Sequence, residues 1–316
     1  MSAMIVLDRL SKRFNQLIAV DGITLTVKRG EVLAFLGPNG AGKSTTMKMV
    51  TGFLTPTAGT AAVCGFDMTT QPLAAKAKLG YLPEGAPAYG DMTPAAFLSF
   101  IANVRGYSRV ERGKRVAAVA KRVALTEVLY QPIDTLSKGF RRRVGLAQAI
   151  LHNPEVLILD EPTDGLDPNQ KHHVRTLIRD MAADKAIIVS THILEEVEAL
   201  CCRAVIIARG RLVADGTAEE LLAHLPCHNA VTVTVAAAEA TVVEQKLRRL
   251  VHACDVEHIK NENAPDESSR RLRVLPREGR ALTAAVSEAL RSHALIALTV
   301  ERGRLDDVFR TLTLPG

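Results

Sequence analysis

The stretch GPNGAGKST at residues 37–45 constrains the fold of this chain more than any other feature. It follows an apolar run, Val32 to Leu36, and it precedes a segment that suits a helix beginning near Lys43. In this pattern the glycines let backbone N–H groups wrap around a phosphate, Lys43 reaches the terminal phosphates, and Ser44 offers a hydroxyl to Mg2+. A strand, a glycine-rich turn and a helix in this order therefore predict a phosphate-binding α/β core.

Two adjacent carboxylates follow a second apolar run in PEVLILDEP. A continuous apolar strand is what the centre of a parallel sheet requires. Phosphoryl transfer to water needs a metal to neutralise charge and a group that orients or deprotonates the water. Asp160 suits the metal and Glu161 suits the water. A surface turn would explain this pair alone, but not beside the glycine-rich loop.

A second phosphate-binding element occurs at LSKGFRRRVGLAQAI, residues 136–150. Its small residues Ser137 and Gly139 stand where a loop turns into a helix, and the free N–H groups and dipole of a helix start favour an anion. It closes a stretch of about residues 85–153 that we expect to be helical, including FLSFIANVRG and KRVAAVAKRVALTEVL. One chain thus carries two elements of this kind.

Five motifs in order resemble those of the ATP-binding subunits of ABC transporters, from about Met4 to Leu222. GPNGAGKST resembles the family's Walker A motif, LSKGF its signature, ILDEP its Walker B motif, GLDP its D-loop and STH its H-loop. The resemblance implies an α/β P-loop ATPase with a RecA-like parallel sheet, an antiparallel β subdomain and a helical subdomain at about 85–153. It also implies that two copies pair head to tail, so that each signature helix caps the ATP held by the other copy.

The resemblance implies ATP and Mg2+ as cofactors and assigns roles by motif. Ser44 and Asp160 would bind Mg2+, Glu161 would be the general base, and His192 would touch the γ-phosphate. The residues implied to contact the phosphates through Walker A are Gly37, Pro38, Asn39, Gly40, Ala41, Gly42, Lys43, Ser44 and Thr45.

Four further positions carry roles implied by the resemblance. Phe14 would stack on adenine, with a core phenylalanine as the alternative. Ser137 and Gly139 would contact the partner's phosphates, and Asp167 would run along the dimer interface.

Two motifs, GYLPE and LSKGF, depart from the usual family pattern, at Glu84 and at Lys138 and Phe140. Glu84 stands where most members carry a glutamine that reaches Mg2+ and the attacking water, and we expect it to keep a catalytic and metal-binding position although a carboxylate donates no hydrogen bond. Lys138 in the signature either adds positive charge near the partner's phosphates or points to solvent.

The stretches GYLPE and LSKGF, with the ending LDDVFRTLT, resemble a branch that serves ABC-2-type export permeases, including the gliding-motility-associated kind. An integral membrane permease is therefore an expected partner. We expect the chain to be cytoplasmic and to lie on the inner face of the cell membrane through that permease.

The tail differs in composition, and Pro226 marks a boundary between an expected nucleotide-binding domain, 1–225, and a C-terminal domain, 227–316. Its alternating strands and helices predict a small ferredoxin-like β-α-β-β-α-β domain with a regulatory or dimer-stabilising role. His252, Cys254 and His258 match no strong zinc spacing, so an ordinary strand surface is the preferred interpretation.

The composition limits which other classes of protein fit this chain. No apolar run approaches the roughly 18 residues of a membrane span, and five unevenly spaced cysteines fit a reducing compartment. The net charge of +6 does not indicate a nucleic-acid partner, because basic and acidic residues are mixed along the chain and aromatic residues make up only 4% of it. The alternatives are a soluble ABC ATPase acting on ribosomes or nucleic acid, and a regulatory module with little hydrolysis.

Overall fold

The structure is a computed structural model that describes residues 2–86, 88–225, 227–259, 269–277, 280–301 and 303–313. Contacts between residues divide the chain into two units, Met1–Thr217 and Ala218–Leu314. The division falls earlier than the boundary expected at Pro226, a residue that lies outside the described ranges. Each unit is described by itself.

The first unit is built around a six-stranded sheet in the order β10-β9-β3-β8-β7-β6. Strands β9, β3, β8, β7 and β6 are parallel, and β10 runs antiparallel at the edge. The strands are β3 (Val32–Leu36), β6 (Leu79–Leu82), β7 (Val156–Asp160), β8 (Ala186–Thr191), β9 (Arg203–Ala208) and β10 (Arg211–Gly216). Every residue of β3, β7 and β8 is buried, because these apolar runs are covered on both faces. The expected parallel core is confirmed.

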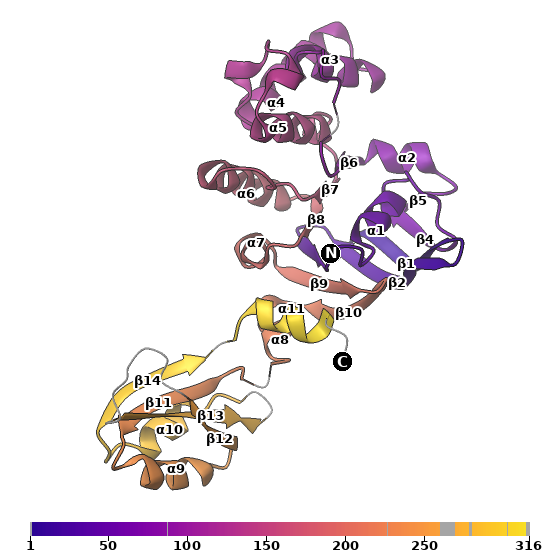
Figure 1. The fold of residues 1–316 in the computed structure, drawn as a ribbon. Coiled ribbons are helices and arrows are strands. Elements are labelled where there is room, and N and C mark those ends of the chain that lie inside the picture. Colours follow the sequence, from indigo (N-terminus) through magenta and orange to yellow (C-terminus); the bar gives the residue numbers. More distant parts are fainter. Residues whose placement is uncertain are drawn as a thin grey trace. The chain divides into compact units, whose positions relative to one another are not determined.

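Elements on each side of this sheet form a separate hydrophobic core. On one side lie α1 (Lys43–Val50) and an antiparallel sheet in the order β2-β1-β4-β5 (Figure 1). Its strands are β1 (Ala3–Phe14), β2 (Leu17–Lys28), β4 (Ala58–Val63) and β5 (Phe66–Asp67), followed by α2 (Pro72–Ala77). Phe35 and Ile158 of the parallel sheet pack in one cluster with Ile5 and Val20 of the antiparallel sheet. On the other side lie α6 (Pro168–Ala182) and α7 (Leu194–Leu200).

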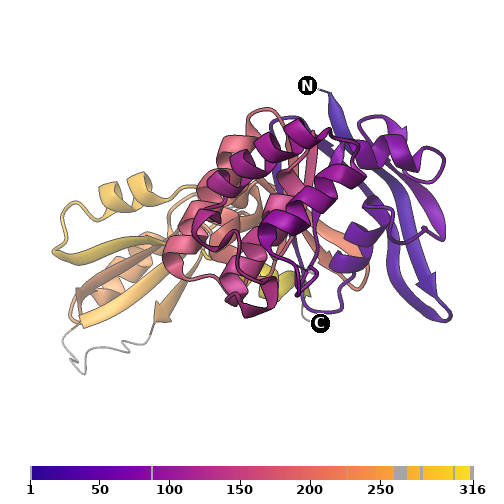
Figure 2. The same cartoon turned by 90° about the horizontal axis from the view of Figure 1, so that it is seen from above.

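The inserted stretch is helical, as expected. It contains α3 (Pro94–Val104), α4 (Arg109–Arg122) and α5 (Lys138–Ile150), with short 3-10 turns at Thr126–Val128 and Ile133–Thr135. Figures 1 and 2 both show the three helices as one cluster. Ser108 and Glu111 form a capping box at the start of α4. The helix ends before the expected ALTEVL segment, because Ala124 adopts a left-handed conformation, φ 52°, that a helix does not contain.

The second unit has a ferredoxin-like fold, as the alternation of its sequence predicts. Its sheet runs β12-β13-β11-β14 with each neighbouring pair antiparallel. The elements are α8 (Ala218–Leu222), β11 (Ala230–Ala236), α9 (Ala240–Arg248), β12 (Ala253–Ile259), β13 (Ser269–Pro276), α10 (Thr283–Ala289), β14 (Leu295–Glu301) and α11 (Leu305–Thr313). Apolar residues of α9, α10 and the sheet share one core, and α8 packs against α11 within this unit.

Within the described ranges, no helix combines the length and the apolar character that crossing a bilayer requires. The described residues also contain no group of three or more His, Cys, Asp and Glu side chains suited to a metal. His258 instead lies 2.9 Å from Glu244, on the neighbouring helix.

Gly80 tests how tightly α5 packs on β6. A Cβ at this position would overlap the carbonyl oxygen of Ala149 and would come within 2.7 Å of Leu157 Cδ2. We expect Gly80→Ala to lower the free energy of unfolding by about 1–3 kcal/mol, the usual cost of overpacking. Gly113 in α4 has open space around its Cβ position, so Gly113→Ala should raise stability by up to about 1 kcal/mol. Urea denaturation of both variants measures the difference, and equal effects would contradict the packing described.

Candidate functional site

The glycine-rich loop follows β3 directly and closes against neighbouring backbone. Gly42 has φ 109°, which L side chains rarely adopt, and a Cβ there would lie 2.5 Å from the Ala19 carbonyl oxygen. Gly40 also has a positive φ, 80°. The loop borders a cavity of about 690 Å3 that is lined by Phe14, Leu17, Ile18, Ala19, Asn39, Gly40, Gly42, Lys43, Ser44, Thr45, Glu84, Arg209 and Gly210. Most of the expected loop residues therefore line one space.

Lys43 begins α1, and its ammonium group is held inside the loop. Nζ donates hydrogen bonds to the carbonyl oxygens of Gly37 at 2.6 Å and of Pro38 at 3.2 Å. The residue is only 8% exposed. Burial lowers the pKa of Lys43, while the nearby carboxylates of Glu161 and Asp160 raise it. A positive charge thus stands at the mouth of the loop, where an anion would meet it.

A second, smaller cavity of about 350 Å3 joins Ser44 and Asp160, from different elements, with Glu84. Asp160 is 2% exposed. Its Oδ1 accepts a hydrogen bond from Ser190 Oγ, whereas its buried Oδ2 has no hydrogen-bond partner among the residues that the structure describes. An orphaned carboxylate oxygen beside a hydroxyl suits a hard divalent cation, and Mg2+ typically takes one or two carboxylates and completes its shell with water and substrate phosphate. The residues present fit Mg2+.

Glu161 directly follows β7 and turns toward His192. Its backbone has φ 51°, a left-handed conformation, and its N–H donates to the Ser190 carbonyl oxygen at 3.1 Å. His192 Nδ1 lies 2.9 Å from Glu161 Oε1. Burial raises the pKa of Glu161, and the hydrogen bond from His192 acts in the opposite direction. The structure therefore brings together the carboxylate and the histidine that the motifs single out.

A buried carboxylate, that of Glu196, forms hydrogen bonds with the segments that carry Glu161 and His192. Glu196 of α7 is 1% exposed. It accepts hydrogen bonds from Thr191 Oγ1 at 3.1 Å and from Thr163 Oγ1, and Arg175 Nη2 lies 3.7 Å away. The bonds tie the segment before His192 to the turn after Glu161. The sequence analysis did not identify Glu196, since one acidic residue in a helical pattern gives no signal of burial.

The signature residues lie at the start of α5, as expected. Ser137 is exposed, and its hydroxyl accepts a hydrogen bond from the Phe140 N–H at 3.3 Å, so it caps the helix. Gly139 is buried, and a Cβ there would approach Gln170 Oε1 to 2.5 Å. Neither residue is among the described residues that line the loop cavity. The two elements expected to bind phosphate are therefore separate within one chain.

Lys138 forms an ion pair within its own chain, and its side chain is 64% exposed. Its Nζ lies 2.8 Å from Asp164 Oδ2, in the turn before α6. This bond lowers the pKa of Asp164. Both alternatives weighed from the sequence for Lys138 therefore stay predictions. Asp167 caps α6, because its Oδ1 accepts from the Gln170 N–H at 2.9 Å.

Phe14 lies at the end of β1 and is not a core residue. Its side chain is 42% exposed, and Lys12 Nζ lies 5.3 Å from the ring centroid. Leu17 and Ile18, both exposed, line the same cavity. Arg209 and Gly210, in the turn between β9 and β10, also line it. The sequence analysis missed these two residues, whose only signal is an Arg-Gly turn between apolar strands.

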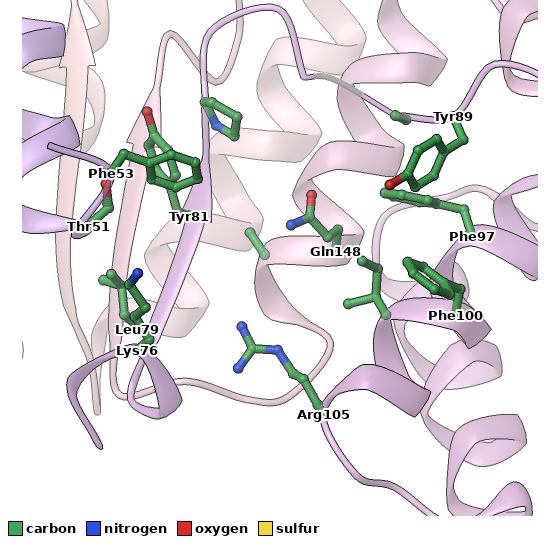
Figure 3. Close-up of a pocket in the computed structure, with 14 residues that line it drawn as sticks. Thr51, Phe53, Lys76, Leu79, Tyr81, Tyr89, Phe97, Phe100, Arg105 and Gln148 are labelled. Carbon is green, nitrogen blue, oxygen red and sulfur yellow. The ribbon is translucent and has the colours of Figure 1, made fainter. Parts of the chain in front are cut away.

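An apolar groove of about 570 Å3 lies beside the segment that carries Glu84 (Figure 3). Aromatic side chains approach it from two sides, with Phe53 and Tyr81 on one and Tyr89, Phe97 and Phe100 on the other. Phe53 is 71% exposed. The polar lining includes Lys76, Arg105 and Gln148. The sequence analysis did not identify this groove, because its lining comes from segments far apart in the chain.

Comparison with known proteins shows which family this chain resembles. A family model described as ABC transporter matches residues 20–164. The linearmycin resistance ATP-binding protein LnrL of Bacillus subtilis is 33% identical over 313 residues, covering 98% of each chain. The Nod factor export ATP-binding protein I of Ralstonia nicotianae is 35% identical over 218 residues, covering 69% of this chain and 68% of that protein. A solved ATP binding subunit of an ABC transporter superposes with a TM-score of 0.65 and 31% identity, covering 69% of this chain and 91% of its own.

The bond between His192 and Glu161 predicts a measurable change in acidity. Loss of a hydrogen bond donated to a carboxylate disfavours its charged form, so we expect His192→Ala to raise the pKa of Glu161 further above its ordinary value. Titration of the glutamate carboxyl carbons by NMR, with the Glu161 signal assigned from Glu161→Gln, measures the shift. The exposed His172 provides the control variant His172→Ala, which should leave that signal unchanged. An unchanged or lowered pKa in His192→Ala would contradict the described contact.

Proposed function

This chain belongs to the family of ABC transporter ATP-binding subunits, and from that membership we propose that it hydrolyses ATP with Mg2+ to power a separate membrane permease. One observation carries the proposal. The buried Asp160 Oδ2 without a described partner, the Ser44 hydroxyl and the Glu161–His192 pair lie beside a loop shaped for phosphate. These are the parts that hydrolysis of a phosphoanhydride needs.

Binding of ATP is assigned to the loop and its neighbours. Backbone N–H groups of residues 37–45 and the Lys43 ammonium would contact the phosphates, and Lys43 would exchange its bonds to the Gly37 and Pro38 carbonyl oxygens for bonds to phosphate oxygens. Phe14, exposed at the edge of the same cavity, would stack on the adenine ring. Its exposed position supports this role over packing in the core.

Bound Mg2+ would be held by Ser44 and Asp160, with Glu84 beside them, and would neutralise charge on the phosphates. Glu161 would take the proton from the attacking water. Its raised pKa brings this carboxylate closer to the range in which a base is effective near neutral pH. The N–H at Nδ1 of His192 would keep the carboxylate oriented, and the other ring nitrogen, Nε2, would face the γ-phosphate.

A second copy of the chain is the proposed partner at the signature. Ser137 and Gly139 start a helix but do not line the loop cavity among the described residues. A helix start is a site for an anion, and in a head-to-tail dimer this one would face the other copy's ATP. Asp167, exposed at the start of α6, would lie at the same interface.

An ABC-2-type export permease is the proposed membrane partner. The aromatic groove beside Pro83 offers an apolar surface next to the Glu84 segment, which suits a helix contributed by another protein. The Nod factor export protein named above supports export as the direction. We place the chain in the cytoplasm, held by this permease at the inner face of the cell membrane.

The C-terminal residues have a proposed regulatory or dimer-stabilising role. We assign residues 1–225 to nucleotide binding and residues 227–316 to this second role. A hydrophobic core of its own, which includes Val233, Val243 and Leu272, supports an independent domain there.

Glu161→Gln tests the reaction. We expect kcat for ATP hydrolysis to fall by about 100-fold or more, within the usual contribution of a general base, while ATP binding remains. Glu195, exposed on α7, provides the matched control Glu195→Gln, which should hydrolyse ATP as the unmodified protein does. Absence of turnover in the unmodified protein would refute the proposed function, and turnover retained in Glu161→Gln would refute the role of Glu161.

Recovery of a permease tests the partner. We expect the Glu161→Gln protein with ATP to recover a multi-helix membrane protein at near equal stoichiometry from detergent-solubilised membranes of its own cell. Adding Phe53→Asp should weaken recovery, because a charge would enter the apolar groove. Val110→Asp is the control, at a site that is 68% exposed and outside the groove lining. Mass spectrometry identifies the partner, and ribosomal or DNA-associated proteins in its place would favour the soluble alternative.

A further inference from the structure

Arg142 is a buried charge that none of the motif assignments uses. It lies in α5 and is only 6% exposed. Its Nη2 donates hydrogen bonds to the backbone carbonyl oxygens of Asp160 and Glu161, and its Nη1 donates to the Pro83 carbonyl oxygen at 3.3 Å. Its Nε is buried without a partner in the described part of the chain. One side chain thus connects the signature helix with two segments that line the proposed site.

Close packing of α5 brings Arg142 to these carbonyl groups. Gly145 lies one turn further on the same face of the helix. A Cβ at Gly145 would come within 2.7 Å of Leu82 Cδ1 and 2.8 Å of Ala86 Cβ. The absence of a side chain at Gly145 therefore lets α5 lie directly against the segment that carries Pro83 and Glu84.

The bonds hold the backbone of Glu161 on both sides. The carbonyl group of Asp160 precedes the Glu161 nitrogen, and the carbonyl group of Glu161 follows its Cα. Between them Glu161 adopts φ 51°, a conformation that is unfavourable for a residue with a side chain and that persists where the surroundings enforce it. Arg142 donates hydrogen bonds to the carbonyl groups on both sides of this residue. The Ser190 carbonyl oxygen accepts a hydrogen bond from the Glu161 N–H.

Arg142 is a cation surrounded by carboxylates. Burial lowers the pKa of Arg142, and the carboxylates of Asp164, Asp160, Glu161 and Glu84 act in the opposite direction. Arginine remains protonated in proteins, so the guanidinium keeps all its donors. Among the described residues, Arg142 donates to backbone carbonyl oxygens and to none of these side chains, so it does not occupy their carboxylate oxygens.

We propose that Arg142 is a positioning residue for ATP hydrolysis, which acts through the Asp160, Glu161 and Pro83 carbonyl groups to hold Glu161 and the Glu84 segment in their working geometry. The inference rests on the proposed ATPase function. Arg142 touches neither substrate nor metal in this scheme. Its loss should therefore lower the rate of the chemical step more than the affinity for nucleotide.

Three variants of the full-length chain test this role. Arg142→Met keeps the length of the side chain and removes every donor, Arg142→Lys restores a charged donor, and Arg141→Met alters an exposed arginine of the same helix. We measure kcat and KM for ATP, the affinity for a fluorescent ATP analogue, and thermal unfolding. In Arg142→Met we expect kcat to fall by about 100-fold, the scale of a small misplacement of a catalytic group, with analogue affinity within about threefold of the unmodified protein. Arg142→Lys should recover part of kcat, and Arg141→Met should match the unmodified protein.

Two results would overturn the inference. Unchanged kcat in both Arg142 variants would show that the carbonyl contacts do not affect the reaction. Loss of analogue binding and of cooperative unfolding in both variants would show a role in folding alone. Failure of the proposed function would be a separate result, because the unmodified protein would then show no ATP hydrolysis. Glu161→Gln is the reference for a protein that has lost hydrolysis.

Discussion

The parallel pairing of β3, β8 and β7 is the constraint on which the rest of the first unit depends. Leu36 pairs with Thr191, and Asp160 pairs with Ser190. Because parallel strands end at the same edge of a sheet, this register brings the glycine-rich loop, the two carboxylates and His192 together from distant parts of the sequence. These apolar strands form the centre of the core, since every residue of β3, β7 and β8 is buried.

Charged side chains at this edge of the sheet form hydrogen bonds mainly with backbone and hydroxyl groups, and few of them pair with an opposite charge. Lys43 donates to two loop carbonyl oxygens, Arg142 donates to three carbonyl oxygens, and Asp160 accepts from Ser190. The arrangement leaves Asp160 Oδ2 without a partner among the described residues, because the cations beside it are bonded elsewhere. Burial then raises the pKa of Glu161, which is the direction that a general base needs.

Much of the fold could be predicted because each element carries a local signal. The apolar runs at Val32–Leu36 and at residues 156–159 indicated central parallel strands, and strand and helix alternation in the tail indicated the ferredoxin-like order. The end of α4 was placed too late, because the left-handed Ala124 interrupts a helical pattern without a glycine or proline. Arg142 and Glu196 were missed, since sequence patterns do not distinguish a buried charge from a solvated one.

The sequence by itself determined the chemistry available to this protein: a glycine-rich loop, a lysine, two carboxylates and a histidine at fixed places in the chain. It determined them because backbone freedom and side-chain donors are properties of single residues. Only the tertiary structure decided that Lys138 pairs with Asp164, that aromatic residues from separate segments form one groove, and that Arg142 reaches Glu161. Such contacts depend on how closely α5 packs on the sheet, and that distance is set by the whole core.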